Sequence, residues 1–155
     1  MKFAVMSREN CKKWCYQKHV DKSLIISISD NWAAPNKVFE SKDNRVVDIL
    51  RLYFDDIDCE RRDLFHGMTD ADAQKIADFI AKHKANFGNS SESIQKIIVH
   101  CNAGVSRSAG VCAAISKYLT GDDEAFFAGG YRPNMFCYSK VLKALYEQSI
   151  SNIEK

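Results

Sequence analysis

The sequence feature that most constrains the fold is an apolar run followed by a glycine-containing turn and then by a helical pattern. Residues 96–100 (Lys-Ile-Ile-Val-His) form a short and nearly continuous apolar run, as expected of a central strand covered on both faces. The turn ends near Arg107, where a helical pattern begins and runs to about Leu119. A strand, a tight turn and a helix in this order are typical of an α/β domain.

Strand and helix patterns alternate along the rest of the chain. Thr69 and Asp72 are spaced as a capping box, which predicts the start of a long helix. Residues 30–44 are expected to be irregular. The expected fold is an α/β domain of residues 1–155, with a central, mostly parallel sheet of four or five strands flanked by helices. Expected strands cover 3–6, 24–29 and 46–54, and expected helices cover 8–17, about 70–87, 123–128 and 138–153.

Composition and charge exclude several classes of protein. The chain has 155 residues, of which 46% are hydrophobic and 27% charged, as in an ordinary globular domain. A net charge of +2 is too small to indicate a nucleic-acid partner. No apolar run approaches the ~18 residues needed to span a bilayer. Residues 1–7 are typical of a strand rather than of a signal peptide, so we expect a cytoplasmic protein without a membrane partner.

The six cysteines do not form a recognisable disulfide or zinc pattern. The chain is large for a disulfide scaffold and lacks a secretion signal. Cys11 and Cys15 are four positions apart, and no second Cys or His pair at ligand spacing follows them. We therefore expect no metal site, and we interpret Cys112 as a small buried side chain on a helix.

The turn between the predicted strand and helix has the geometry of an anion site. Successive backbone N–H groups of residues 102–106 can point into one concavity, and the N-terminus of the following helix adds its partial positive charge. Cys101 lies at the base of this concavity, where the same groups stabilise a thiolate and lower the thiol pKa below its free value of about 8.5. We therefore expect Cys101 to be a nucleophile toward a bound phosphate.

Further residues of the turn fit this chemistry. Arg107 carries a planar fork of donors that can bind two phosphate oxygens and stabilise developing charge, which lysine would do less well. Gly104 lets the backbone pass close to the anion, and Ser108 can donate a hydrogen bond to the thiolate. The expected phosphate-binding residues are Asn102, Ala103, Gly104, Val105, Ser106 and Arg107.

The pattern His-Cys-x5-Arg-Ser at 100–108, with its Ala-Gly-x-Ser-Arg-Ser interior, resembles the signature of the protein tyrosine phosphatase superfamily. It is most similar to the compact dual-specificity branch of that superfamily. The resemblance covers roughly residues 46–146, including the Arg-Pro-Asn motif at 132–134, and the first 45 residues match only loosely. It implies a phosphatase that works through a cysteinyl-phosphate intermediate. Neither a metal nor an organic cofactor is expected, because Arg107 and backbone donors neutralise the phosphate.

The resemblance also assigns roles to residues outside the anion site. His100 would support the loop from behind and tune the thiolate, and Asn134 would buttress the loop by hydrogen bonds. An aspartic acid would protonate the leaving oxygen and later activate water. Asp56 fits best, at the end of a strand pattern, although it lies 45 positions before Cys101, a longer gap than is usual in small members. The additional residues are expected after Asp56 or around 88–93. The alternatives for the acid are Asp55, Asp58 and Asp63.

The substrate suggested by this resemblance is a phosphomonoester on a protein. The loop interior carries no Lys or His, which phosphoinositide-directed members of the superfamily often place there. Phosphotyrosine is the first candidate, with phosphoserine and phosphothreonine as further ones. The alternatives are a small or other non-protein phosphoester as substrate and a phosphate-binding module without turnover. Because low-pKa thiolates oxidise readily, Cys59 or Cys137 is a candidate for reversible pairing with Cys101.

Overall fold

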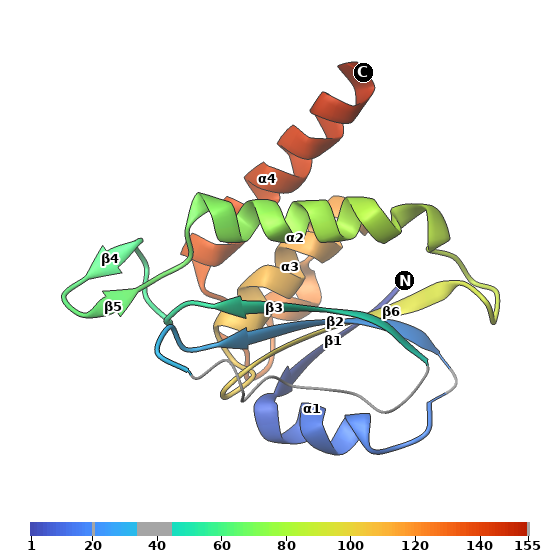
Figure 1. The fold of residues 1–155 in the computed structure, drawn as a ribbon, viewed down its shortest axis with the longest axis horizontal. Helices are drawn as coiled ribbons and strands as arrows, with labels where there is room; N and C mark the ends of the chain where they lie inside the picture. Colours follow the sequence, from blue (N-terminus) through green and yellow to red (C-terminus); the bar gives the residue numbers. More distant parts are fainter. Residues whose placement is uncertain (20, 34–44, 155) are drawn as a thin grey trace.

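The structure, a computed structural model, describes residues 1–19, 21–33 and 45–154 (Figure 1). The predicted strands are all present, and the predicted long helices are present with bounds that differ by a few residues. Two short 3-10 helices, Lys84–Asn86 and Glu124–Phe127, join them, and the second lies where a helix was predicted. The expectation of irregular structure for residues 34–44 falls outside the described residues. The elements are β1 (Lys2–Ser7), α1 (Arg8–Cys15), β2 (Lys22–Ser29), β3 (Val46–Tyr53), β4 (Arg61–Arg62), β5 (Phe65–His66), α2 (Asp70–His83), β6 (Ile94–Cys101), α3 (Arg107–Thr120) and α4 (Met135–Glu154).

Four described strands form one sheet in the order β1-β6-β2-β3, and every neighbouring pair is parallel. This confirms the predicted α/β class and the central position of the apolar run, which forms β6. Because parallel strands end at the same edge, the register brings Ser7 beside Cys101 and Ser29 beside Tyr53. The residues that follow these strands therefore meet at one edge, where ligands of open α/β sheets usually bind.

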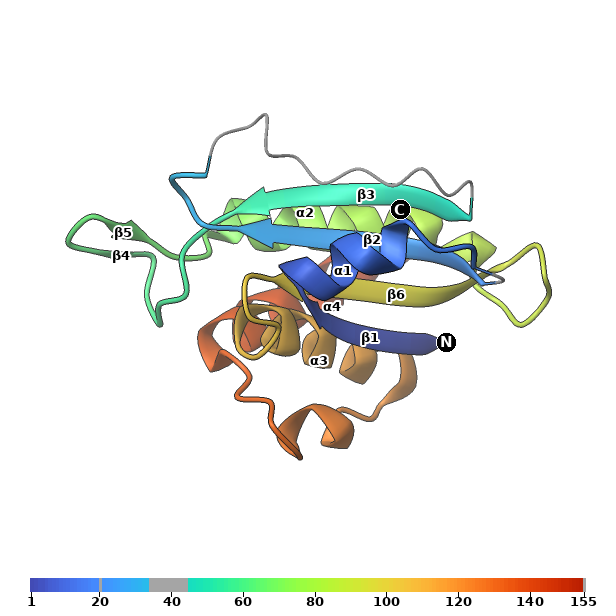
Figure 2. The same ribbon diagram turned by 90° about the horizontal axis from the view of Figure 1, so that it is seen from below.

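Helices cover both faces of the sheet. In Figures 1 and 2, α1 lies alone on one face, whereas α2, α3 and α4 lie on the other. On the α1 face, Cys11 and Cys15 are buried against Ile25 of β2 and Ile98 of β6. The larger core lies between the opposite face and α2, α3 and α4. No helix within the described residues is long and apolar enough to cross a membrane.

Helix α2 begins as predicted and ends earlier than predicted. The Thr69 hydroxyl accepts from the Asp72 N–H, and the Asp72 carboxylate accepts from the Thr69 N–H, which completes the capping box. The helix ends at His83, so Phe87 lies beyond it. The His83 side chain is buried, with Nε2 at 2.8 Å from Oδ2 of Asp48 on β3. His83 is therefore a buried contact between α2 and β3 rather than a surface residue.

A two-stranded antiparallel hairpin, β4–β5, was not predicted from the sequence. It lies between β3 and α2 and projects from the body of the protein (Figure 1). Gly67 closes its base: a Cβ there would lie 2.1 Å from the Cys59 carbonyl oxygen, so no other residue fits. The hairpin therefore occupies part of the long interval between Asp56 and Cys101.

Candidate active site

The loop after β6 curls between the end of that strand and the start of α3. Cys101, the last residue of β6, is 2% exposed, and Arg107 is the first residue of α3. Gly104 has a φ of 71°, and a Cβ there would lie 2.5 Å from the Met6 carbonyl carbon and from the Ser7 nitrogen. Only glycine fits both requirements, so the loop can pack tightly against the end of β1.

The environment of Cys101 favours its thiolate. Sγ lies 3.0 Å from Oγ of Ser108. Burial raises the pKa of the Cys101 thiol, but hydrogen bonds from Ser108 and Gly104 and the charge of Arg107 outweigh burial and hold the pKa below its ordinary value. The opposite holds for Cys112, also on α3, because burial alone raises the pKa of its thiol.

His100 is fully buried. Burial lowers its pKa to about 4. Nδ1 lies 3.3 Å from the Cys101 carbonyl oxygen, which can only accept a hydrogen bond, so the ring proton sits on Nδ1. The Ser27 hydroxyl then donates to Nε2 at 2.7 Å. The ring thus ties the end of β6 to β2.

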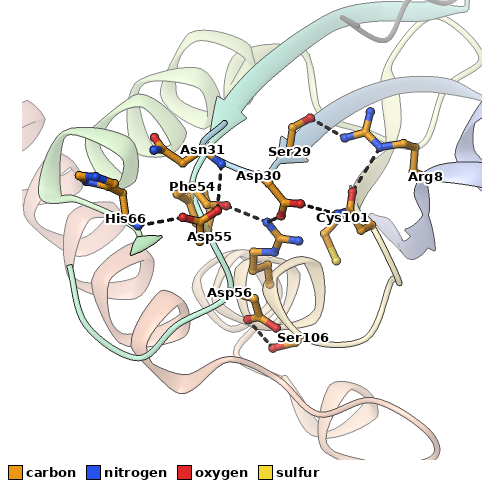
Figure 3. A network of polar contacts seen from close by, with 12 residues as sticks. Arg8, Ser29, Asp30, Asn31, Phe54, Asp55, Asp56, His66, Cys101 and Ser106 are labelled. Carbon is orange, nitrogen blue, oxygen red and sulfur yellow. Dashed lines mark hydrogen bonds and ion pairs between the residues drawn. The ribbon is translucent and has the colours of Figure 1, made fainter. Parts of the chain in front are cut away.

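Arg107 is buried and held by one edge of its guanidinium group. Nη1 donates to Oδ1 of Asp30 at 2.8 Å and to the Phe54 carbonyl oxygen at 2.7 Å (Figure 3). Nε is buried and has no hydrogen-bond partner among the described residues. Because such groups normally have partners, the Nε edge is the one available to a ligand.

Asp30 connects Arg107 to the loop and to the N-terminal part of the chain. Its second oxygen, Oδ2, accepts from Nδ2 of Asn102 at 2.9 Å. Oδ1 of Asn102 accepts from Nε of Arg8 at 3.3 Å, and Nη2 of Arg8 donates to Ser29 (Figure 3). Sequence reasoning missed Asp30 and Arg8. The position of Asp30 directly after a predicted strand was the signal that could have indicated it.

Asp56 is exposed beside the loop. Its Oδ1 accepts from Oγ of Ser106 at 2.8 Å and from Nδ2 of Asn134 at 2.9 Å. The Asn134 N–H also donates to the Ser106 carbonyl oxygen, and the Arg132 N–H donates to that of Val105. The loop after β3, the turn before α4 and the Cys101 loop are therefore joined.

The other candidate acids lie in different surroundings. Asp55 is buried, and its two oxygens accept from the backbone N–H groups of Asn31 and His66. Asp58 is ion-paired with Arg62 at 2.6 Å. Asp63 lies in the turn of the hairpin, with a φ of 54°. Within the described residues, the hydrogen bonds and ion pair found for Asp55 and Asp58 do not go to the loop that follows Cys101.

The other residues of the loop and the remaining cysteines differ in exposure. Asn102 and Ala103 are exposed, whereas Val105 and Ser106 are partly buried. Cys137 is buried, and burial raises the pKa of its thiol to about 12. Cys59 is partly buried and reduced, so its pairing with Cys101 stays a hypothesis. No group of three or more His, Cys, Asp or Glu residues in the described ranges could hold a metal ion.

Comparisons with known proteins identify the fold. No protein-family model matches the sequence, and no curated protein matches it. The crystal structure of PTPMT1 in complex with PI(5)P is 19% identical over 97% of this chain and 94% of that chain, with a TM-score of 0.56. Human DUSP28 is 17% identical over 96% and 94%, with a TM-score of 0.53. A mouse putative dual specificity phosphatase, complexed with zinc tungstate, is 19% identical over 86% and 76%, with a TM-score of 0.51.

Proposed function

Because the chain has the fold of the compact dual-specificity phosphatases, over nearly its whole length, we propose that it is a cysteine-dependent phosphatase of phosphorylated proteins. One observation carries this proposal. The Nε edge of Arg107 is buried and has no partner in the described structure, and it belongs to the same loop as the low-pKa Cys101. A buried cationic edge beside a thiolate suits a phosphate dianion that the thiolate attacks.

In the first step, the Cys101 thiolate attacks phosphorus. The S–P bond forms as the bond from phosphorus to the leaving oxygen breaks. Arg107 binds two equatorial oxygens through its free edge, while its Nη1 contacts with Asp30 and the Phe54 carbonyl keep the fork in place. Asp56, beside the loop, gives a proton to the leaving oxygen.

In the second step, water releases the phosphate. Asp56, now a carboxylate, takes a proton from the water as its oxygen attacks phosphorus and the S–P bond breaks. The products are inorganic phosphate and the Cys101 thiolate. The Ser108 hydroxyl, 3.0 Å from Sγ, stabilises that thiolate as the leaving group. Asp56 gives up one proton in the first step and takes one back in the second, so the two steps need no metal.

The substrate class follows from the charge of the loop. PTPMT1 has been crystallised with PI(5)P, so a phosphoinositide is an alternative for a protein of this fold. The loop interior here, Asn102–Ser106, contributes no cationic side chain. A singly phosphorylated side chain needs only one cationic fork, which Arg107 supplies, and this favours phosphotyrosine, with phosphoserine and phosphothreonine next.

The test of this function is hydrolysis of p-nitrophenyl phosphate in the presence of EDTA. We expect turnover that EDTA leaves unchanged and that inorganic phosphate inhibits competitively, because the product occupies the same site. A phosphopeptide panel then compares phosphotyrosine with phosphoserine and phosphothreonine. Phosphate binding without any turnover would overturn the enzyme and indicate a phosphate-binding module instead.

Replacing Asp30 by asparagine should lower kcat for p-nitrophenyl phosphate about tenfold, because Arg107 loses its charge-assisted clamp and samples other orientations. The transition state needs two N–H donors of the Arg107 fork, one for each of two phosphoryl oxygens. Binding of vanadate, which resembles that state, should therefore weaken more than binding of inorganic phosphate. Inhibition constants for the two anions measure this difference.

Asp55→Asn is the matched control for Asp30. Asp55 is a buried carboxylate at the same edge of the sheet, but its bonds go to backbone N–H groups. The Asp55→Asn substitution should lower the free energy of unfolding and leave the ratio of vanadate to phosphate binding unchanged. An equal change of that ratio in both variants would mean that Asp30 only stabilises the fold and does not position Arg107.

A further inference from the structure

The hairpin of residues 58–67 has a base that is fixed to the body of the protein. The backbone N–H of Asp55 donates to the His66 carbonyl oxygen at 2.6 Å, and the His66 N–H donates to the Asp55 carboxylate at 2.8 Å. Nζ of Lys140 on α4 binds Glu60 at 3.1 Å. These bonds hold the hairpin as a fixed projection directly after Asp56.

The tip of this hairpin carries two adjacent apolar side chains in water. Leu64 is 90% exposed and Phe65 is 53% exposed. Asp63 takes a left-handed φ of 54°, which makes the turn that places them there. A two-stranded hairpin of this length gains little stability from such a tip. Single exposed apolar residues are ordinary, but two on a fixed projection at the rim of a site can meet its ligand.

A groove connects the hairpin with the Cys101 loop. It is lined by residues 56–58, Arg62, Ser106 and residues 132–135. Arg62 comes from β4, so one wall of the groove is the hairpin itself. Met135, which is 49% exposed, adds an apolar side chain to the lining. A chain that leaves the phosphate site through this groove passes the hairpin.

We propose that the hairpin binds an apolar side chain of a polypeptide substrate near its phosphorylated residue. This inference rests on the proposed phosphatase function. A small phosphoester would fill only the polar groove and leave Leu64 and Phe65 unused. An anionic phospholipid surface would not be attracted, because three acids oppose two arginines in the hairpin. A polypeptide supplies both an extended backbone for the groove and apolar side chains for the tip.

The experiment uses the full chain and the double variant Leu64→Ser/Phe65→Ser. Substrates are p-nitrophenyl phosphate and phosphotyrosine peptides of glycine and serine, each with one leucine at a different position around the phosphotyrosine. For the wild type, we expect kcat/KM to differ by about tenfold between the best and the worst leucine position. In the variant this preference should disappear, while kcat/KM for p-nitrophenyl phosphate should stay within about twofold.

Ile153→Ser is the matched control, since Ile153 is 81% exposed near the far end of α4, and it should keep the preference. Equal rates for all leucine positions in the wild type, with p-nitrophenyl phosphate hydrolysed, would overturn the hairpin proposal and leave the phosphatase intact. A different result would indicate that the hairpin binds a membrane instead of a polypeptide. In that case the peptides would be hydrolysed at equal rates, and the double variant would hydrolyse PI(5)P in phosphatidylcholine vesicles more slowly than the wild type. No hydrolysis of any substrate would overturn both proposals.

Discussion

Replacing Cys101 by serine should reduce hydrolysis of p-nitrophenyl phosphate by roughly 10⁴-fold or more, since the nucleophile itself is lost. The hydrogen bonds and charge that hold the pKa of the thiol below its ordinary value make a thiolate from Cys101. A serine hydroxyl in the same place stays protonated at neutral pH, and it would be a poor leaving group in the second step. Initial rates with EDTA present measure the loss.

The Cys101→Ser protein must still bind phosphate for this result to concern the chemistry. Arg107 and its contacts with Asp30 and Phe54 are unchanged in the variant, so calorimetry should detect binding of inorganic phosphate. Cys59→Ser is the control, because Cys59 is a partly buried cysteine whose thiol donates to the Arg61 carbonyl oxygen. Comparable activity in wild type and Cys101→Ser would remove Cys101 from the mechanism.

The phosphate loop could be predicted from the sequence because its determinants are local. The strand, the turn and the helix follow one another within residues 96–120, and Gly104 lies in the turn that requires it. The helix start at Thr69 is local in the same sense, since its capping box needs only Asp72. Short-range rules are sufficient wherever the partners of a residue are a few positions away.

Asp30 could not be assigned from the sequence because its partners are far away along the chain. Asp30 reaches Arg107 and Asn102 only after the sheet order β1-β6-β2-β3 has brought β2 beside β6. The first 45 residues, which match the family loosely in sequence, supply β1 and β2 and contribute Arg8 and Asp30 to the site. The structural likeness to PTPMT1 accordingly covers 97% of the chain rather than residues 46–146 alone.

The β4–β5 hairpin could not be predicted from the sequence for a different reason. Strands of two residues, Arg61–Arg62 and Phe65–His66, are too short to show the alternation by which strands are recognised. The burial of His83 could not be predicted because nothing in the local sequence distinguishes a buried histidine from an exposed one at the end of an amphipathic helix. Its partner, Asp48, is supplied by β3.

Replacing Asp56 by asparagine should reduce kcat/KM for phenyl phosphate by about 10²-fold or more, because the leaving oxygen is no longer protonated. Unlike kcat, kcat/KM does not depend on the later hydrolysis of the phosphorylated enzyme, in which Asp56 also acts. Phenol has a pKa of about 10, like tyrosine, and leaves poorly as an anion. The loss for p-nitrophenyl phosphate should be much smaller, since p-nitrophenolate leaves without a proton. The ratio of the two kcat/KM values therefore identifies the acid, and asparagine keeps an oxygen for Ser106 and Asn134.

Asp58→Asn is the matched control, because Asp58 is an exposed carboxylate two positions away that lines the same groove but pairs with Arg62. It should leave the ratio between the two substrates as in the wild type. If Asp58→Asn instead lowers turnover of phenyl phosphate selectively and Asp56→Asn does not, the acid is Asp58, and the bonds from Ser106 and Asn134 to Asp56 serve only to hold the loops together. A selective loss therefore decides between Asp56, which the sequence favours by its position nearer the end of β3, and Asp58, which lies two positions further along.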